Sequence, residues 1–316
     1  MKKNNAHQIS GLFFSSIFFT LVIFSFANAW MSGDDAGTCG AQFLKINMGG
    51  RPSGMGGAYS ALATDVNAVY WNPGGLASVK NNEAEAMYLK WFEDTSLGYI
   101  SFAMPVIGGA VGFGITALST TDMEKRIDDT PEHTSFDAED IAVGFSYGKN
   151  IKTFGVGVGI KAIQSKIDTE KSNLALAADL GCLKQVPVGN NKLNLSASIQ
   201  NIGTGIKYIN KNDPLPGIVR IGAGYFLLND KMIASIDLNL PRDNKVNANF
   251  GFEYRIVTGN LVLPVRIGYR TLTDFETIDG ISAGFGIGFV NYNLNFAWVP
   301  YGDLGDTIRL SIGGKF

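Results

Sequence analysis

Histidine is nearly absent from this sequence. His7 and His133 are the two histidines among 316 residues. A Ser-His-Asp triad, a histidine metal site or a histidine general base therefore has too few residues to draw on. Lys and Arg together number 26 against 28 Asp and Glu, so no excess of positive charge is available to bind a nucleic acid. These shortages predict that the protein is not an enzyme, carries no cofactor or metal, and has no nucleic acid partner.

Cysteine is also scarce, since Cys39 and Cys182 are the two in the chain. Export would carry both into an oxidising compartment. The strand order derived below places Cys182 at the periplasmic end of the sixth strand and Cys39 in a periplasmic N-terminal segment. On this placement, a disulfide between them and two unpaired thiols both remain open.

Long apolar runs are missing after the N-terminus, although 46% of the residues are hydrophobic. A helical membrane protein needs about 20 apolar residues for each span, so this class is excluded. Charged residues make up 17%, below the roughly 25% of soluble proteins, and glycine reaches 39 residues. A β-barrel fits this composition because it distributes its apolar residues by alternation.

Residues 1–29 have the form of an export signal. Lys2 and Lys3 precede an uncharged apolar stretch, 11–26, and Ala27-Asn28-Ala29 is a small-residue cleavage site. The mature chain is therefore expected to begin at Trp30. An uncleaved membrane anchor is the alternative interpretation of the same stretch.

The final ten residues, 307–316, alternate strictly between apolar and polar. The apolar face is formed by Ile308, Leu310, Ile312, Gly314 and Phe316, and the other face by Arg309, Ser311, Gly313 and Lys315. Period-two alternation predicts a strand with one apolar and one polar side. As the last element, this strand closes a barrel onto the first strand or forms the edge of a sandwich. Arg309 and Phe316 are the candidate residues of this closing strand.

Alternation continues through the chain from about residue 84. Each alternating segment is near the roughly 9–11 residues that a tilted strand needs to cross a bilayer. The predicted strands are 83–93, 96–104, 109–120, 139–148, 153–165, 173–183, 192–201, 217–228, 231–240, 246–255, 261–271, 280–290, 292–300 and 306–316. We therefore predict an all-β fold, a transmembrane antiparallel up-and-down β-barrel of about 14 strands over residues 81–316.

The connections between these strands sort by length. Short links follow the second, fourth, eighth, tenth and twelfth strands, and long links follow the third, seventh and eleventh. A barrel with both termini in the periplasm alternates short inner turns with long outer loops, whereas a sandwich has no reason to do so. Two links depart from the pattern: 241–245 is short for an outer loop, and 184–191 is long for an inner turn.

Residues 30–80 lack sustained alternation and form a separate region. Their aromatic and apolar content argues against a solvated tail. The most distinctive stretch has strong turn chemistry and consists of Asn72, Pro73, Gly74, Gly75 and Leu76. We interpret the region as a periplasmic cap or as a plug folded into the barrel, and a loose tail is the alternative.

Polar residues gather on one face of the predicted strands. The candidates for a polar lumen are Asp237, Asn247, Asn249, Glu253, Arg255, Arg266 and Arg270. Burial of this set in a dry core would be costly, so the set requires a wet lumen or contact with a polar plug. Glycines such as Gly112, Gly155, Gly157, Gly284, Gly286 and Gly288 share the inward face. They indicate close approach of another backbone, or they simply permit bending of the wall.

Several stretches resemble the PorV/PorQ family. They are Gly37–Leu44, Gly54–Ala58, Tyr70–Ala77, Leu215-Pro216 with Arg220 and Gly222, and Trp298–Arg309 with the final Phe316. The likeness covers nearly all of the mature chain. It departs at Cys39, Gly74-Gly75 and Ile308, where the family usually has a small residue, Ala-Gly and His. The family belongs to a larger group that includes the FadL-type long-chain fatty-acid transporters, whose N-terminal hatch has a similar Asn-Pro turn.

The resemblance implies an outer-membrane β-barrel of a Gram-negative (diderm) bacterium, surrounded by outer-membrane lipid. Some family members serve type IX secretion, so one hypothesis is an accessory of protein secretion or cell-surface attachment, with secretion-system proteins or exported cargo as partners. The alternative is a FadL-like passive transporter of small hydrophobic molecules, with a hydrophobic ligand in the barrel and residues 30–80 as the gate. Whether the lumen is open or plugged does not follow from the sequence.

Overall fold

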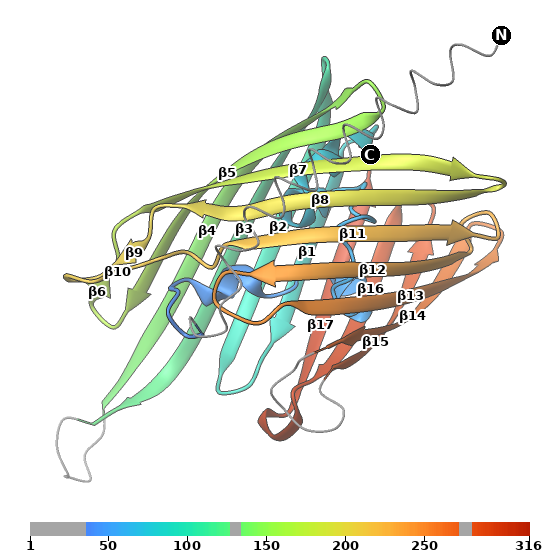
Figure 1. The fold of residues 1–316 in the computed structure, drawn as a ribbon. Coiled ribbons are helices and arrows are strands. Elements are labelled where there is room, and N and C mark those ends of the chain that lie inside the picture. Colours follow the sequence, from blue (N-terminus) through green and yellow to red (C-terminus); the bar gives the residue numbers. More distant parts are fainter. Residues whose placement is uncertain (1–35, 127–133, 272–279) are drawn as a thin grey trace.

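A closed ring of 14 antiparallel strands dominates the structure, a computed structural model that describes residues 36–126, 134–271 and 280–316 (Figure 1). The strands are β1 (Glu83–Lys90), β2 (Thr95–Val106), β3 (Gly109–Lys125), β4 (Thr134–Ile151), β5 (Phe154–Ile167), β7 (Ala175–Val188), β8 (Asn191–Gly203), β11 (Ile218–Leu227), β12 (Met232–Pro241), β13 (Asn247–Thr258), β14 (Leu261–Arg270), β15 (Ile281–Phe289), β16 (Tyr292–Pro300) and β17 (Asp306–Lys315). Each strand pairs with the next one in this order, and β17 pairs with β1. The prediction of an all-β barrel of 14 strands is confirmed.

Short elements decorate one rim of the ring. They are the two-residue strands β6 (Glu170–Lys171), β9 (Ile206–Lys207) and β10 (Asn212–Asp213), and the 3-10 helix η4 (Gly302–Leu304). β9 and β10 pair with each other inside the connection between β8 and β11. None of these four was predicted, because runs of two or three residues carry too little periodicity to detect.

The seam between β1 and β17 joins the two ends of the barrel wall. Its register runs from Glu83 opposite Lys315 to Lys90 opposite Ile308. Beyond β17, the amide of Phe316 donates to the carbonyl of Asn82 at 2.9 Å, and the Phe316 ring lies 6.2 Å from the ring of Phe102. The closing role predicted for the last strand therefore matches the observed pairing, and no sheet edge is left open at the seam.

Alternation places apolar side chains outside and polar side chains inside. On β13, Phe250, Phe252 and Tyr254 are exposed, whereas Asn249 and Glu253 are buried. Successive side chains of a strand point to opposite faces, so this pattern turns the apolar face outward. The same inside-out arrangement is typical of barrels that cross a membrane.

The two rims of the barrel differ in the length of their connections. At the short-turn end, β7 reaches Val188 and β8 starts at Asn191, so their link shrinks to the turn of Gly189 and Asn190. The prediction that 184–191 is a long inner link is thus wrong, because Lys184–Val188 continue the strand despite their polar residues and Pro187. The long-loop end holds the connections β8–β11 and β12–β13 and the projecting hairpin of β3 and β4.

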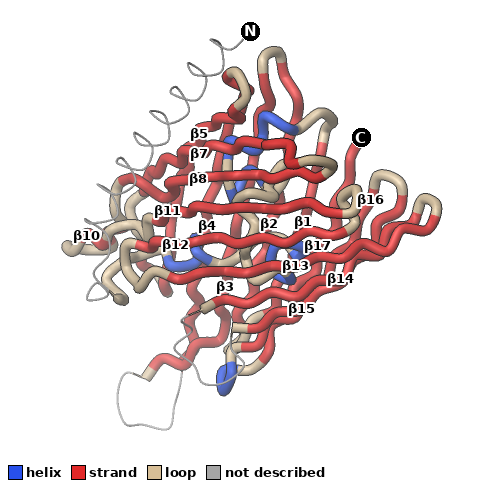
Figure 2. The backbone as a smooth tube through the Cα atoms, turned by 45° about the vertical axis from the view of Figure 1, so that its right-hand side comes forward, coloured by secondary structure: helices blue, strands red, loops and turns tan. Residues whose placement is uncertain are grey.

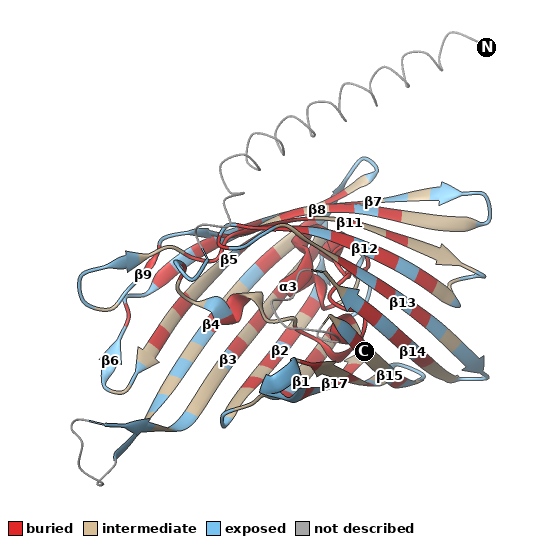
Figure 3. Ribbon diagram, turned by 60° about the horizontal axis from the view of Figure 1, so that its bottom comes forward, coloured by how far each residue is buried: buried red, intermediate tan, exposed pale blue. Residues whose placement is uncertain are grey.

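Residues 36–80, here called the inner segment, lie inside the ring. They form the 3-10 helix η2 (Gln42–Lys45), the helical turns α2 (Gly50–Gly54) and α3 (Ala68–Trp71), and the 3-10 helix η3 (Pro73–Ser78). Figure 2 shows these turns enclosed by strands, and Figure 3 shows α3 buried within the ring. Its apolar side chains and those of β1 and β2 form the main core, which includes Met48, Tyr59, Trp71, Leu76 and Leu89.

No helix in the described parts of the chain is long and apolar enough to span a membrane. The predicted export signal, residues 1–29, lies outside the described residues, so it stays a prediction. The division into residues 30–80 and 81–316 likewise stays a prediction as a statement about domains.

Candidate functional site

The inner segment runs through the lumen from one rim to the other. Near its start, Lys45 pairs at 2.8 Å with Asp243 in the β12–β13 connection, at the long-loop end. Near its end, the carbonyl of Ala77 accepts a hydrogen bond of 3.1 Å from Asn150, beside the short turn between β4 and β5. The candidate functional site is therefore the whole interface between this segment and the inner face of the wall.

The predicted turn of Asn72–Leu76 is buried against β4, β5 and β7. Asn72 caps η3 by accepting from the Gly74 amide at 3.0 Å, and its side-chain nitrogen donates to the Cys182 carbonyl at 3.0 Å. Proline in the first turn of η3 suits the start of a helix, because its missing N–H would have no helical partner. The turn is thus tied both to itself and to the backbone of β7.

Glycines of the wall make room for this turn, and we call Gly148, Gly155, Gly157 and Gly181 the glycine cradle. A Cβ at Gly157 would lie 2.2 Å from the carbonyl oxygen of Pro73, and one at Gly181 would lie 2.1 Å from Oδ1 of Asn72. Gly74 fits for the same reason, since its own Cβ would lie 2.8 Å from the Gly181 carbonyl. Close approach of two backbones therefore explains these inward glycines.

The other predicted inward glycines divide between the two explanations. A Cβ at Gly112 would meet Val69 at 2.5 Å, and one at Gly284 would meet Gly54 at 3.1 Å, so both face the inner segment. Gly286 and Gly288 have neighbours only from adjacent strands. Close approach of the segment accounts for the first pair but not for the second.

Asp237 binds the middle of the inner segment. Its Oδ2 accepts the backbone amides of Tyr59 at 3.1 Å and Ser60 at 2.8 Å, and the carboxylate is fully buried. The Ser60 hydroxyl lies 2.8 Å from the hydroxyl of Ser196 on β8. Two amides that the irregular backbone leaves unpaired are thereby satisfied by the wall.

Three guanidinium groups converge on Glu253 of β13. Its carboxylate lies 2.9 Å from Arg51 of the inner segment, 2.7 Å from Arg255 and 2.6 Å from Arg266, which faces it from β14. Burial alone would lower the pKa of Arg51, but the carboxylate of Glu253 raises it above its ordinary value. A single buried carboxylate therefore joins the segment to two wall strands.

Tyr59 links this cluster to Asp65. Its hydroxyl accepts from Arg51 at 2.9 Å and donates to Asp65 at 3.2 Å. Burial raises the pKa of Tyr59 well above its ordinary value, so the hydroxyl keeps the proton that it donates.

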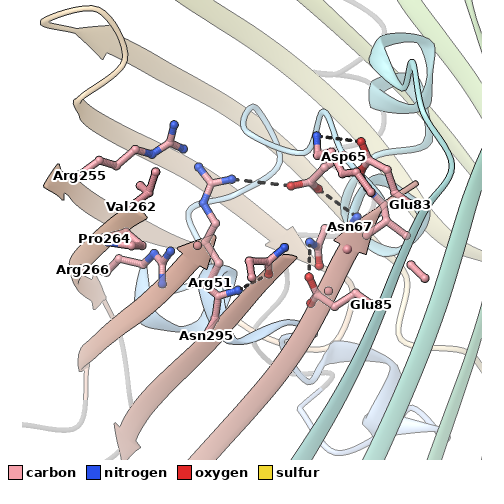
Figure 4. A pocket seen from close by; sticks show the side chains of 17 residues that line it. Arg51, Asp65, Asn67, Glu83, Glu85, Arg255, Val262, Pro264, Arg266 and Asn295 are labelled. Atoms are coloured by element: carbon pink, nitrogen blue, oxygen red, sulfur yellow. Dashed lines mark hydrogen bonds and ion pairs between the residues drawn. The ribbon is translucent and has the colours of Figure 1, made fainter. Parts of the chain in front are cut away.

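A polar chamber of about 230 Å³ opens beside this cluster at the short-turn end. Figure 4 shows Arg255 and Arg266 on one side, Glu83 and Glu85 of β1 on the other, and Arg51 between them. Glu83 pairs with Lys315 at 2.9 Å, and Glu85 accepts from Asn67 at 3.1 Å. The chamber carries charges of both signs, which suits water and polar groups rather than an apolar ligand.

The opposite end of the lumen is apolar on the side of β4, β5 and β7. A second cluster there is buried between η2 and the wall and consists of Phe43, Leu44, Ala142, Ile163, Ala175, Ala177, Ile206 and Leu215. The inside of the barrel thus holds an apolar cluster on one side near the long loops and a charged chamber on another side near the short turns.

The structure brings together some of the predicted lumen residues and separates others. Glu253, Arg255 and Arg266 form one cluster, while Asp237 and Asn249 pair across β12 and β13 farther along the strands. Asn247 accepts from Asn239 at 2.9 Å, and Arg270 is half-buried near the long loops. Contact with the inner segment, more than a wet lumen, accommodates the buried members of this set.

Arg309 of the closing strand faces inward and is 1% exposed. Its Nη1 donates to Thr307 at 2.9 Å and its Nη2 to the Tyr301 hydroxyl at 3.2 Å. Arg309 therefore secures the end of the barrel near η4, away from the Glu253 cluster.

Sequence reasoning missed the partners that the inner segment supplies. Arg51, Tyr59 and Asp65 were not singled out, nor was Glu85 on β1. One signal was available, since Arg51 is the sole arginine between residues 30 and 80, within a glycine-rich and apolar stretch. An isolated charge in such surroundings requires a partner of opposite sign.

The two cysteines are both free thiols. Cys39 is not near the short turns, because the adjacent Gly40 donates to Pro214 in the β8–β11 connection at 2.9 Å. Cys182 alternates outward on β7, well before the strand ends at Val188. The expected placement of both cysteines at the periplasmic end is wrong, and the disulfide that it left open is not formed.

The described residues contain no group of three or more His, Cys, Asp or Glu arranged to hold a metal ion.

Comparison with known proteins identifies a sequence family and several solved structures of similar fold. A model of an uncharacterised protein family, UPF0164, matches residues 27–217. No curated protein sequence matches the chain. The fold is similar to that of the toluene transporter TodX of Pseudomonas putida, with a TM-score of 0.57 at 11% identity, over 84% of this chain and 96% of that one.

Two further solved structures are similar to the same degree. A FadL homologue of Pseudomonas aeruginosa gives a TM-score of 0.55 at 11% identity, over 85% of this chain and 98% of that one. The monoaromatic hydrocarbon channel CymD gives 0.56 at 12% identity, over 86% and 98%. At this level of identity, the likeness concerns the fold.

Proposed function

The chain belongs to the uncharacterised protein family UPF0164, and we propose that it is a passive outer-membrane channel for small hydrophobic molecules, of the FadL type. The observation that carries this proposal is a lumen filled from rim to rim by a segment of the same chain, within a barrel whose outer face is apolar. The fold likeness to a toluene transporter and a hydrocarbon channel supports the same function.

The proposed location is the outer membrane of a Gram-negative (diderm) bacterium. Exposed apolar side chains such as Ile160, Leu176 and Phe285 cover the outer face of the wall. A signal peptide at residues 1–29 would direct the chain to export. Barrels of this class turn their short links to the periplasm, so the long-loop end faces the cell exterior.

In this proposal, the inner segment is the gate. A hydrophobic solute enters among the long loops and reaches the apolar cluster of Phe43, Ile163 and Leu215, which is buried until the segment moves. The seated segment blocks the rest of the lumen, so passage requires its displacement from the wall. The charged chamber at the short-turn end then becomes a route to water, because polar groups line it.

The resemblance to the PorV/PorQ family, and with it an accessory role in protein secretion, stays a prediction. Of the three similar solved structures, one is a toluene transporter, one is a monoaromatic hydrocarbon channel and one is a FadL homologue. The comparisons therefore favour the transporter, which was the alternative hypothesis.

The test joins the inner segment to the wall strand β8 by a disulfide that can later be reduced. Ser60 and Ser196 have hydroxyls 2.8 Å apart, a separation suited to a disulfide once both residues are cysteines. In a background with Cys39→Ser and Cys182→Ser, we expect the S60C/S196C variant to take up radiolabelled toluene only after reduction. The matched control, S60C alone, should take it up in both conditions, in cells that lack other hydrocarbon channels.

A second measurement examines the gate itself. Deletion of residues 48–77 should raise the ion conductance of the barrel in planar bilayers, because the deletion removes the part of the segment that meets Asp237, Glu253 and the glycine cradle. Two results together would show that the segment does not gate a channel. They are equal toluene uptake by the S60C/S196C variant before and after reduction, and unchanged conductance after the deletion.

A further inference from the structure

A hollow of about 490 Å³ lies on the outer surface of the wall, across β4, β5, β7, β8 and β11. One row of outward side chains follows the strand register through it: Tyr147, Val158, Leu180, Ile199 and Val219. Val158 and Leu180 are 53% and 54% exposed, whereas Val219 in the same row is 4% exposed. The surface therefore sinks into the wall along this row.

The hollow has the length of a lipid chain in one leaflet. Its row crosses four strand-to-strand steps of about 4.8 Å each, which gives roughly 19 Å. One leaflet of a bilayer has a hydrocarbon depth of roughly 15 Å, half of the total. The row also runs from the short-turn end of β4 toward the long-loop end of β11, because neighbouring strands are staggered. An acyl chain lying in the hollow would thus cross the leaflet obliquely, because the row is perpendicular to tilted strands.

Two lysines stand at the short-turn end of this hollow. Lys149 is exposed on β4 and follows Tyr147 by one outward position toward the turn. The ammonium of Lys184 on β7 lies 4.6 Å from the ring centre of Phe154, which also belongs to the outer face. No acidic side chain is among the described residues that line the hollow. The site thus offers apolar contacts along its length and positive charge at one end.

We propose that this hollow binds one phospholipid of the leaflet that meets the short turns, with its phosphate between Lys149 and Lys184 and one acyl chain along the Val158–Val219 row. Water cannot fill an apolar hollow of this size in a membrane at low cost, whereas an acyl chain fills it with favourable contacts. Lysine at the membrane surface attracts phosphate through charge and hydrogen bonds.

The bound acyl chain would lie on the outer side of the wall, directly opposite the Pro73-Gly74 turn of the inner segment. Gly157 and Gly181 line the hollow on its outer side and receive the Pro73-Gly74 turn on its inner side. The wall between lipid and turn is therefore one backbone thick at this point. The lipid supports the wall where the inner segment presses against it most closely.

The test measures lipid retention by native mass spectrometry of the detergent-purified full chain. The probes are a phosphatidylglycerol with 16- and 18-carbon chains and a diacylglycerol with the same chains but no phosphate. We expect K149Q/K184Q to lower phosphatidylglycerol binding by about tenfold and to leave diacylglycerol binding unchanged. Lys166→Gln, at the long-loop end of β5, is the matched control and should change neither.

A second variant tests the hollow rather than the charges. Ala197 lines the hollow on β8, and Ala197→Phe would fill it and abolish binding of both probes. Ala234→Phe, at an exposed outward position of β12, adds the same ring elsewhere and should have no effect. Wild-type binding by A197F, or equal losses in K149Q/K184Q and K166Q, would overturn the proposal.

Photo-crosslinking keeps the proposal testable if a variant fails to fold. A phosphatidylglycerol with a diazirine in one chain should label peptides from β5, β7 and β8 of the wild-type protein in preference to those from β12 and β13. Uniform labelling around the barrel would show ordinary lipid contact and would refute a defined site. None of these measurements depends on transport, so the proposal can fail while the channel function stands.

Discussion

The inner segment is held in different ways on two sides of the lumen. Around Asn72–Leu76, the glycine cradle of β4, β5 and β7 holds it by close contact between backbones. Around Arg51–Asn67, carboxylates of β1 and β13 hold it, since Glu253 pairs with Arg51, and Glu83 and Glu85 accept from the Val66 amide and the Asn67 side chain. Backbone contact requires an accurate fit and tolerates no added atoms, whereas a charged contact can exchange its partner for water.

This difference suggests which part of the inner segment stays fixed and which part is displaced first. The cradle has no space for water or for a second arrangement, so it acts as the fixed end of the segment. The charged side adjoins the chamber, where Arg51 and Asp65 are partly accessible and lie 3.7 Å apart. Displacement of the segment would therefore begin at the charged side, because water can replace the contacts that are lost there.

The substitution with the largest expected effect disrupts the glycine cradle. Gly157→Ala would place a Cβ 2.2 Å from backbone atoms of Pro73, and neither partner can move aside by rotating a side chain. We expect the turn to leave its seat, so that chymotrypsin cleaves after Tyr70 and Trp71 in the native barrel. Gly288→Ala is the control, since its Cβ would meet its nearest neighbour at an ordinary 3.5 Å. Wild-type protease resistance of G157A would contradict the account of the cradle.

The next effect breaks the charged side. Glu253→Gln would leave Arg51, Arg255 and Arg266 without their shared carboxylate, and the loss of one member of a buried ion pair costs about 3–5 kcal/mol. We expect a lower midpoint of urea denaturation in lipid vesicles, followed by tryptophan fluorescence. Glu139→Gln, at an exposed position of β4, should leave the midpoint unchanged.

A double variant sharpens this test. Arg51→Met combined with Glu253→Gln should lose less free energy of unfolding than the sum of the two single variants, because the residues interact directly. Strict additivity would mean that Arg51 does not depend on Glu253.

A smaller effect is expected from removing either of two asparagine side chains, Asn72 and Asn150, on the cradle side of the lumen. Asn72→Ala removes the hydrogen bonds to Gly74 and to the Cys182 carbonyl within a fully buried site, at a cost of about 1–3 kcal/mol. Asn150→Ala removes one bond to Ala77 at the exposed rim, so it should cost about 1 kcal/mol or less. Urea denaturation of both variants checks the ranking, and an equal cost would indicate that burial does not decide it.

The smallest effect concerns the thiols, since neither side of the lumen is secured by a disulfide. Burial, with Asp243 nearby, raises the pKa of the Cys39 thiol, so less thiolate is present at pH 8 than in an exposed cysteine. We expect maleimide to modify Cys39 slowly in the native protein and quickly in urea. Two reactive thiols per chain should be counted in urea without a reducing agent, and a count of zero would reveal a disulfide.

Much of the barrel was predictable from the sequence because its information is local. Alternation within β13 or β17 fixes which side chains face out, and the turn glycines mark where strands end. The strand β7 was predicted too short because Lys184, Gln185 and Pro187 disturb the pattern near its end. Those residues extend past the apolar band of the wall. Outward side chains there do not face lipid, so the apolar–polar alternation ends.

The site was predictable only on the side of the wall. Glu253, Arg255 and Arg266 were recognised as inward polar residues, since their face follows from strand parity. Their partner Arg51 precedes Glu253 by 202 positions in the chain, and no local pattern connects two such residues. The same holds for the cradle, where the inward glycines indicated a close neighbour but could not identify it as Asn72–Gly74.

The seam between β1 and β17 has a consequence for the order of assembly. The inner segment is synthesised before the wall, and the last strand completes the wall by pairing with the first. A closed ring leaves no gap through which a folded segment of this bulk could later be threaded sideways. The segment therefore reaches its seat either before the seam forms or through a rim of the finished barrel, and never through the wall.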